Sequence, residues 1–493
     1  MEPSPLSALA AAAGSAVPAG ADPARLVGPA VVIDSRAAEP GALFVALPGE
    51  RADGHSYVAA AAERGAAAAL VAHPVEGSRG LAQLLVPDPL AALADVARWS
   101  LDRERGHVTV IGLTGSSGKT TTKDLLAQVL AAAGETVAPE NSFNNEMGVP
   151  LTALKVGATT RFLVSEMGSR GPGHIAHLAG IVRPEIGVVL NIGHAHAGEF
   201  GSKAATAQAK GELIEALPAA GWAVLNAADP LVAGLAARHA GPTAWFSAAG
   251  RPDARPGDLA VWAEDVAADP AQRHSFTLRS AGPGPAGPAT ESADRVTLLV
   301  PGRHQVANAL AAAAAALAAG LAPVAIAAAL GAATLRSHWR LEVHARADGL
   351  VVVNDAYNAN PDSLAAALET TAGLAAAARA ADPRTRFIAV LGDMLELGDQ
   401  ARALHQAAGA QAAAAGVTDL VAVGEFGPAL AAGARAANPA IATTVVNNRD
   451  DAVSHLASAA PPAIVLVKAS RGVGLERVAE SLLGPFGAKD GPC

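Results

Sequence analysis

Cysteine is nearly absent from this sequence, since the only one among 493 residues is Cys493. A single thiol cannot form a disulfide bond within the chain, and a chain without disulfides is typical of the reducing cytosol. The first 17 residues contain Glu2 but no Lys or Arg, so they lack the basic region of a secretory signal. We therefore predict a cytoplasmic protein.

An excess of positive charge is also lacking. The 36 Lys and Arg residues are outnumbered by 45 Asp and Glu residues, which gives a formal net charge of −9. Nucleic-acid-binding proteins carry a basic patch or stripe, so we expect no nucleic-acid partner. Nothing in the sequence indicates self-association, and a monomer is the default expectation.

Long uncharged apolar runs are lacking with one exception, residues 309–334. That run has the length of a membrane span. However, it consists mostly of Ala, and the segment from Gly320 to Pro323 interrupts it. We expect two short buried helices joined by a turn, and no membrane insertion.

The strongest motif lies in residues 108–130. A β-branched apolar run leads into a turn of small residues and then into a segment with apolar residues on one face. Strand, loop and helix in this order can surround a phosphate with backbone N–H groups at the positive end of the helix. We predict a nucleotide site in which Lys119 reaches the β- and γ-phosphates and Thr120 binds Mg²⁺. The loop residues assigned to it are Gly115, Ser116, Ser117, Gly118, Lys119, Thr120 and Thr121.

This loop departs from the G-x-x-x-x-G-K-[ST] pattern, because Leu113 occupies the position of the first Gly. The alternative is an ordinary structural turn whose lysine is only solvated. The agreement of strand, glycines, Lys-Thr pair and helix favours the nucleotide site.

The length suggests about three domains. Strand-like and helix-like segments alternate, which predicts an α/β protein with mostly parallel sheets and right-handed crossovers. We predict a small α/β unit at 1–100, a phosphate-loop domain at 101–335 and a Rossmann-like unit at 336–493. Residues 250–300 resemble an antiparallel addition, with an exposed Gly/Pro-rich loop near 281–290.

In such sheets the functional residues lie at the carboxyl ends of the strands. Glu166, His194 and His196 are predicted at such ends. Mg²⁺ prefers hard oxygen ligands, which Thr120, Glu166 and phosphate oxygens supply, and His196 could hold a second ion. The alternatives are that Glu166 caps a helix and that one of the two histidines is a hydrogen-bonded loop residue.

Two further positions leave alternatives open. Ser35 and Arg36 follow a predicted strand, where they could contact a phosphate or a uracil, or Arg36 could pair with a nearby carboxylate. Lys210 is predicted near the start of a helix, where a cation has the wrong sign for the helix dipole. Conversion of its amine to a carbamate by CO₂ would remove this conflict, but the pattern alone does not justify that step.

Taken together, the motifs resemble the Mur ligase family of ATP-dependent amide-bond-forming enzymes. Members of this family have TGxxGKT loops, which accounts for Leu113. The segments most similar to the members that add D-alanyl-D-alanine are 34–55, 141–154, 165–175, 354–363 and 391–398.

Three alternatives to that activity predict different sequence features. A member that adds the third amino acid usually carries Asp-Asn-Pro-Arg, which is absent, and Tyr-Ala-His-Thr-Pro, which here reads Tyr-Asn-Ala-Asn-Pro from Tyr357. A folate-polyglutamylating enzyme does not fit the DSR…DGH segment. A non-catalytic ATP-binding relative is expected to have lost Lys119, Glu166 or Lys210, and all three are present.

The resemblance implies an activity in cytoplasmic peptidoglycan precursor synthesis. ATP phosphorylates the terminal carboxylate of UDP-MurNAc-tripeptide, and the amine of D-Ala-D-Ala attacks the acyl phosphate. It implies that Lys119 stabilises the transferring phosphoryl group and that Thr120 and Glu166 hold Mg²⁺. It further implies that His196 and a carbamylated Lys210 hold a second Mg²⁺ or orient the acyl phosphate.

The resemblance also implies binding residues for each substrate. The nucleotide contacts it implies are Asn308, Arg340, Asp355, Tyr357, Asn358 and Asn360, and the other substrate contacts are Ser35, Arg36, Asn144, Asn145, Lys468, Ser470 and Arg471. Two positions depart from the family pattern: the carboxylate of Glu199 is shifted by one residue, and Gln305 replaces the usual Asn.

Overall fold

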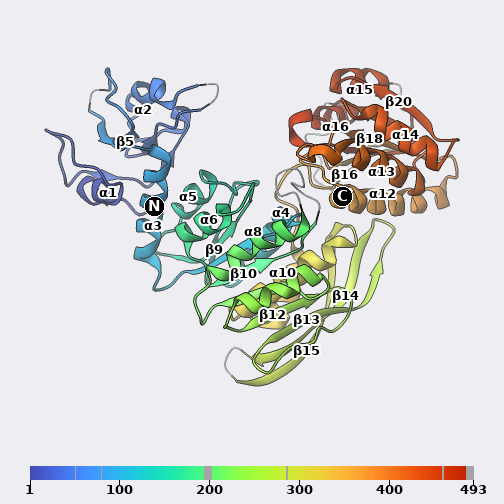
Figure 1. Cartoon of the computed structure of the whole chain (residues 1–493), viewed down its shortest axis with the longest axis horizontal. Coiled ribbons are helices and arrows are strands. Elements are labelled where there is room, and N and C mark those ends of the chain that lie inside the picture. Colours follow the sequence, from blue (N-terminus) through green and yellow to red (C-terminus); the bar gives the residue numbers. More distant parts are fainter. Residues whose placement is uncertain (50–51, 79, 194–201, 285–286, 458–459, 485–493) are drawn as a thin grey trace.

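The computed structural model describes residues 1–49, 52–78, 80–193, 202–284, 287–457 and 460–484. Three α/β units, each built on its own larger sheet, follow one another along the chain, and two short strands of the first unit form a further two-stranded sheet. Figure 1 shows the N-terminal unit at the upper left and the C-terminal unit at the upper right, with the central unit below and between them. The predicted α/β class with largely parallel sheets is confirmed.

The first unit contains a four-stranded parallel sheet in the order β3-β4-β5-β6. Its last helix, α3, begins with Pro89 behind Asp88, whose carboxylate accepts the N–H groups of Leu90 and Ala91. The elements are β1 (Ser4–Pro5), α1 (Leu6–Ala12), β2 (Leu26–Val27), β3 (Val31–Val32), η1 (Ser35–Ala37), β4 (Leu43–Val45), η2 (Gly54–Tyr57), α2 (Val58–Glu63), β5 (Ala68–Val71), β6 (Ala82–Leu85) and α3 (Pro89–Glu104).

The central unit contains a nine-stranded sheet in the order β15-β14-β13-β12-β11-β10-β7-β9-β8. From β13 to β8 in this order, neighbouring strands are parallel, whereas β14 is antiparallel to both β13 and β15. The strands are β7 (Thr109–Thr114), β8 (Glu135–Val137), β9 (Thr160–Glu166), β10 (Ile186–Val189), β11 (Trp222–Asn226), β12 (Thr243–Ser247), β13 (Leu259–Ala268), β14 (Arg273–Gly284) and β15 (Gly287–Pro301).

Helices cover both faces of this sheet. Apolar residues of α4, α10 and α11 share one core cluster with the strands, and α5 and α6 pack with α3 on the other side. The helices are α4 (Lys119–Ala131), α5 (Gly148–Ala153), α6 (His174–Val182), α8 (Lys203–Glu215), α9 (Pro230–Ala233), η3 (Gly234–Arg238), α10 (His304–Ala318) and α11 (Pro323–Ala332).

The third unit contains a six-stranded sheet in the order β16-β17-β21-β18-β19-β20, in which only β16 is antiparallel to its neighbour. The elements are β16 (Glu342–Ala345), β17 (Leu350–Asn354), α12 (Pro361–Ala381), β18 (Arg386–Gly392), η4 (Gly398–Gln400), α13 (Ala401–Ala414), β19 (Asp419–Val423), α14 (Gly427–Ala437), β20 (Ala442–Val446), α15 (Arg449–Leu456), β21 (Ala463–Lys468), η5 (Arg471–Val473) and α16 (Glu476–Leu483).

Two expectations about the apolar and glycine-rich segments have different outcomes. The Ala-rich run forms two helices, α10 and α11, as predicted. Among the described residues no helix is both long and apolar enough to span a bilayer. The loop predicted near 281–290 is wrong in extent, because β14 continues to Gly284 and β15 begins at Gly287. Cross-strand contacts hold this hairpin together, including a 2.8 Å hydrogen bond between the Ser280 and Ser292 hydroxyls.

Candidate active site

The phosphate loop connects β7 to α4 at the carboxyl edge of the central sheet. Gly118 is the N-cap of α4 and has a left-handed backbone, with φ of 78°. A Cβ atom at this position would lie 2.5 Å from Oδ1 of Asn308. Both the backbone conformation and the space therefore require glycine, and α10 lies directly against the loop.

Asn191, which follows β10, holds the loop in place. Its Oδ1 accepts the N–H of Ser117 at 2.9 Å, its Nδ2 donates to the Ser117 carbonyl at 3.2 Å, and its carbonyl accepts the N–H of Ser116. Asn191 is not among the residues predicted for the site. The signal for it was a polar residue at a strand end, which is the same signal that selected Glu166.

Glu166 ends β9 and faces the first turn of α4. Its Oε1 accepts a hydrogen bond from Nδ2 of Asn144 at 2.8 Å and from Oγ1 of Thr120 at 3.4 Å. Its Oε2 is buried and has no hydrogen-bond partner in the described part of the chain. A buried carboxylate oxygen without a partner is costly, and beside a hydroxyl it suits a divalent cation that takes oxygen ligands.

Lys119 is partly buried, Lys210 in α8 is buried, and the charge of the first acts on the second. The Lys119 amine donates to the Gly115 carbonyl at 2.8 Å, and burial lowers its pKa. Burial, together with the charge of Lys119, lowers the pKa of Lys210 to about 7. A substantial fraction of Lys210 is therefore a neutral amine near neutral pH.

The position of Lys210 in its helix corrects a prediction. Helix α8 begins at Lys203, with Ser202 as its N-cap, so Lys210 lies in the middle of the helix and not near its start. The helix dipole falls off within the first turn, so the proposed conflict of charge with the dipole is wrong. The unusual feature of Lys210 is its burial beside another lysine.

The third unit contributes Arg340, which reaches across to the phosphate loop. Its Nη2 donates to Oγ1 of Thr120 at 3.0 Å and to Oγ of Ser142 at 3.1 Å. Its guanidinium carbon lies 4.0 Å from the centre of the Tyr357 ring. Behind it, Asp355 and Lys468 form a buried ion pair of 2.5 Å.

These groups line one cavity of about 720 Å³ between the central and third units. The predicted residues that line it are Ser116, Ser117, Gly118, Lys119, Thr120, Thr121, Asn144, Asn145, Glu166, Asn308, Arg340, Asp355, Tyr357, Asn358, Asn360, Lys468, Ser470 and Arg471. Residues at its walls that the sequence analysis did not select include Ser142, Asn191, Asn226, His304, Asp362 and Leu395.

Comparison with known proteins identifies the group to which this arrangement belongs. The chain matches the family description "Mur ligase middle domain" over residues 113–316, "Mur ligase, glutamate ligase domain" over 339–471 and "Mur ligase family, catalytic domain" over 30–98. The UDP-N-acetylmuramoyl-tripeptide–D-alanyl-D-alanine ligase of Mycobacterium tuberculosis is 43% identical over 490 residues, which cover 92% of each chain. The chain belongs to the Mur ligase family.

Other members of the Mur ligase family agree over the same extent. The ligase of the same name from Escherichia coli is 35% identical and covers 92% of this chain and 93% of its own. A crystal structure of MurF from Acinetobacter baumannii superposes with a TM-score of 0.82 at 29% identity, covering 97% of this chain and 98% of its own. MurF of Thermotoga maritima, solved in complex with ADP, gives a TM-score of 0.72 at 26% identity, covering 92% of this chain and 96% of its own.

Some predicted site residues of this Mur ligase do not line the cavity. Neither Gly115, in the loop, nor Lys210, in α8, is a wall residue; the Gly115 carbonyl accepts a hydrogen bond from the Lys119 amine, and the charge of Lys119 acts on Lys210. His196 falls outside the described residues, as do His194 and Glu199. Asn145 and Asn360 do line the cavity, but their side-chain oxygens already accept hydrogen bonds within the fold: Asn145 accepts the N–H of Gly148, and Asn360 caps α12.

Ser35 and Arg36 lie in the N-terminal unit of this Mur ligase and not at the cavity. The Arg36 guanidinium pairs with Asp34 at 2.7 Å, and its side chain is 85% exposed. Ser35 is buried in the short helix η1. The contact between Arg36 and a nearby carboxylate, one of the two alternatives, is therefore present, and the guanidinium remains open to solvent.

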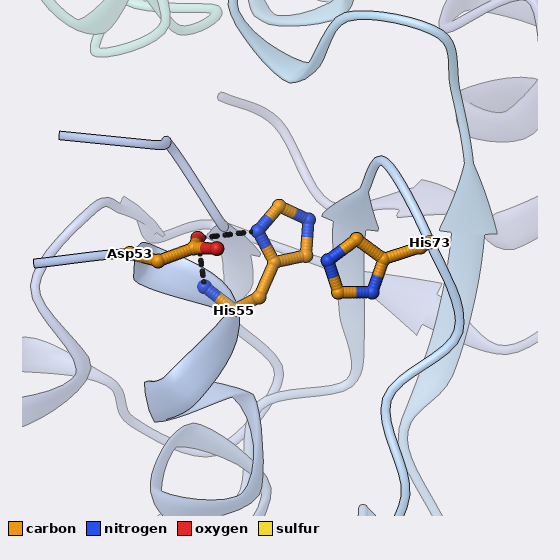
Figure 2. A group of neighbouring side chains, drawn as sticks. All are labelled: Asp53, His55 and His73. Carbon is orange, nitrogen blue, oxygen red and sulfur yellow. Dashed lines mark hydrogen bonds and ion pairs between the residues drawn. The ribbon is translucent and has the colours of Figure 1, made fainter.

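The Asp-Gly-His segment of the same unit forms a cluster with His73 (Figure 2). Nδ1 of His55 lies 2.6 Å from Oδ1 of Asp53, and Nε2 of His55 accepts the N–H of Ala72 at 2.8 Å. The His73 ring stacks on the His55 ring at 4.2 Å. Because both ring nitrogens of His55 are engaged, the cluster ties this segment to the end of β5 and leaves His55 no free lone pair for a metal ion.

Proposed function

We propose that this chain joins D-alanyl-D-alanine to UDP-MurNAc-tripeptide with the hydrolysis of ATP to ADP and phosphate, as a step of peptidoglycan precursor synthesis. The relatives that carry this name match the chain nearly end to end. The observation that carries the proposal is one cavity in which Lys119, the unpartnered oxygen of Glu166 and Arg340 meet. Such a set neutralises the charge of a transferring phosphoryl group.

ATP lies with its phosphates on the loop from Gly115 to Thr121. The Thermotoga maritima relative was solved in complex with ADP and has the same fold, and in this chain the phosphate loop leads into α4. Thr120 and Glu166 would hold Mg²⁺, which supplies charge neutralisation between the phosphates. Further nucleotide contacts are assigned to Asn308, Arg340, Asp355, Tyr357, Asn358 and Asn360.

The reaction has two steps. A terminal carboxylate oxygen of the tripeptide attacks the γ-phosphorus, the bond to the β-phosphate oxygen breaks, and ADP leaves. The free amine of D-Ala-D-Ala then attacks the acyl carbon, and the tetrahedral intermediate expels phosphate as the amine loses its proton. Lys119 and Arg340 stabilise the negative charge of the first step, and positioning of the two substrates supplies much of the rate.

Lys210 acts in this scheme as a carbamate. Only a neutral amine reacts with CO₂, and the lowered pKa of Lys210 supplies that form near neutral pH. The carbamate is an anionic oxygen ligand, and with His196 it would hold a second Mg²⁺ or orient the acyl phosphate.

The remaining substrate contacts are divided among the three units. Ser35 and Arg36 are assigned to the uridine diphosphate end, Asn144 and Asn145 to the peptide side, and Lys468, Ser470 and Arg471 to the dipeptide or nucleotide. The proposed domain boundaries near 100 and 336 are supported by the division of the 4-, 9- and 6-stranded sheets among three units, although α3 continues to Glu104. Both the nucleotide-linked precursor and ATP are cytoplasmic metabolites, so we place the chain in the cytoplasm, as a monomer.

The test is a phosphate-release assay with purified protein and ATP. We expect release only when UDP-MurNAc-tripeptide and D-Ala-D-Ala are both present, because the first supplies the carboxylate and the second consumes the acyl phosphate. Each substrate alone is the control. Release with a diamino acid and the dipeptide-stage nucleotide instead would assign the chain to the member that adds the third amino acid.

A further inference from the structure

Residues 334–337, which link the central and third units, lie along helix α4. This helix follows directly after the phosphate loop. Oδ2 of Asp124 accepts the backbone N–H of Ser337 at 3.0 Å and that of Arg336 at 3.4 Å. Gln128, one turn further along α4, donates to the Thr334 carbonyl at 2.8 Å and accepts the Thr334 N–H at 3.2 Å. Asp124 and Gln128 lie four residues apart on one face of α4, and their side chains hydrogen-bond to the backbone of residues 334–337.

The attachment is buried where it is closest to the phosphate loop. Asp124 and Lys123 are 2% and 3% exposed, and they form an ion pair of 2.5 Å. The Lys123 amine also donates to the Pro139 carbonyl and to the Ser337 hydroxyl. Charges are rarely buried unless they are paired and hydrogen-bonded, and here the partners include the linker itself.

The chain attaches to the third unit only two residues later. The Trp339 carbonyl accepts the N–H of Tyr357 at 3.2 Å, and the Leu341 N–H donates to Asp355 at 3.1 Å. Between Ser337, held by α4, and Trp339, held by the third unit, lies only His338, whose side chain is 76% exposed. His338 is therefore the only residue of the chain between the attachment to α4 and the attachment to the third unit.

The backbone that follows His338 is strained. Trp339 and Leu341 are not glycines, yet they have φ values of 60° and 52°. Such conformations are energetically unfavourable for residues with a side chain and persist where the surroundings fix them. Arg340 lies between these two residues, and its guanidinium reaches Thr120 and Ser142.

From these contacts we infer that Asp124 is a positioning residue for the proposed ligase reaction. It fixes the linker to α4 at Ser337, makes His338 the pivot between the two units, and so places the Arg340 guanidinium beside Thr120 at the phosphate loop. The inference rests on the proposed function for its consequence on the rate, but the attachment itself is a property of the chain without substrates.

The first experiment tests the attachment without the reaction. Hydrogen exchange is measured for the peptide that contains residues 334–341, in the unmodified protein and in Asp124→Ala. We expect exchange in that peptide to become at least about 10-fold faster, because two N–H groups lose their acceptor. The matched control is Asp258→Ala, since Asp258 is also a buried carboxylate that accepts backbone N–H groups, those of Thr243 and Arg255. Unchanged exchange at 334–341 in Asp124→Ala would overturn the inference.

The second experiment is a double-mutant cycle on kcat with ATP and both peptide substrates. Arg340→Ala is expected to lower kcat on the order of 100-fold, as loss of a transition-state charge partner does, and Asp124→Ala about 10-fold through misplacement. If Asp124 acts through Arg340, Asp124→Ala has no further effect in the Arg340→Ala background.

A purely structural role gives a different result in this cycle, namely the same 10-fold loss in both backgrounds, which would overturn the inference. If Asp124→Ala does not fold, Asp124→Asn decides by the same comparison, because it keeps the volume and one acceptor oxygen. A protein that shows the exchange effect but no ligase activity contradicts the proposed function and leaves the attachment standing.

Discussion

At the scale of single residues, Lys210 connects burial to chemistry. Lysine is almost never fully buried without a partner, because its ammonium group loses hydration. Here burial and the charge of Lys119 bring its pKa to about 7. Sequence reasoning selected Lys210 through the family resemblance and gave a helix-dipole reason that is wrong. The physical reason is a tertiary contact, which no local pattern contains.

Lys210→Ala is expected to lower kcat on the order of 100-fold, because it removes the anionic ligand that the carbamate supplies. Bicarbonate or a short carboxylate added to the variant should restore part of the activity. The control is Lys203→Ala, an exposed lysine at the start of the same helix, which should retain full activity. The measurement is phosphate release with both substrates.

Carbamate formation at Lys210 should become faster as the pH rises. With a pKa of about 7, the neutral amine fraction rises from about one-tenth at pH 6 to about nine-tenths at pH 8. Protein stripped of CO₂ should therefore regain activity faster at pH 8 than at pH 6 when CO₂ is returned. Full activity of untreated Lys210→Ala would remove Lys210 from the mechanism.

At the scale of elements, the phosphate loop and α4 were predicted together with their site residues. The burial of Lys123 and Asp124 in α4 was not predicted. The loop could be predicted because strand, small residues and Lys-Thr are local in sequence. Lys123 and Asp124 have the pattern of an ordinary polar helix face. They are buried because residues 334–337 lie on them, more than 200 positions later in the chain. The hairpin β14–β15 was shortened in the prediction for a similar reason, since cross-strand pairing overrides the Gly/Pro signal.

Gly118→Ala tests how the loop is built. Alanine at φ of 78° is strained by about 1–2 kcal/mol, and its Cβ collides with Asn308, whose side chain is bound to Gln305 at 2.8 Å. We expect at least a 10-fold (~1.4 kcal/mol) weaker ATP affinity, measured by calorimetry. Gly173→Ala is the control, because Gly173 is the N-cap of α6 with φ of 85° and has open space around it. Equal loss of ATP affinity in both variants would refute the role of the contact between loop and α10.

At the scale of the whole molecule, the number of units followed from the chain length, and their α/β class followed from the alternation of strands and helices. The contact between the third unit and the central unit could not be predicted in this way. It depends on the single pivot at His338 and on Arg340, whose guanidinium donates to Thr120. The cavity takes its walls from both units, so a nucleotide bound in it contacts two sheets at once. Binding should therefore stabilise both units together.

A non-hydrolysable ATP analogue with Mg²⁺ should slow hydrogen exchange in two separate segments: the loop at 115–121 and the third-unit segment at 354–360. Both line the same cavity, whereas the N-terminal unit contributes no wall residue within the part of the chain that the structure describes. Its peptides are the internal control and should be unaffected. In Arg340→Ala the loop should still be protected, because Lys119 and Thr120 are intact, while protection at 354–360 should weaken, because Arg340 no longer joins Tyr357 to the loop. Protection of the loop alone in the unmodified protein would contradict a nucleotide site shared between the two units.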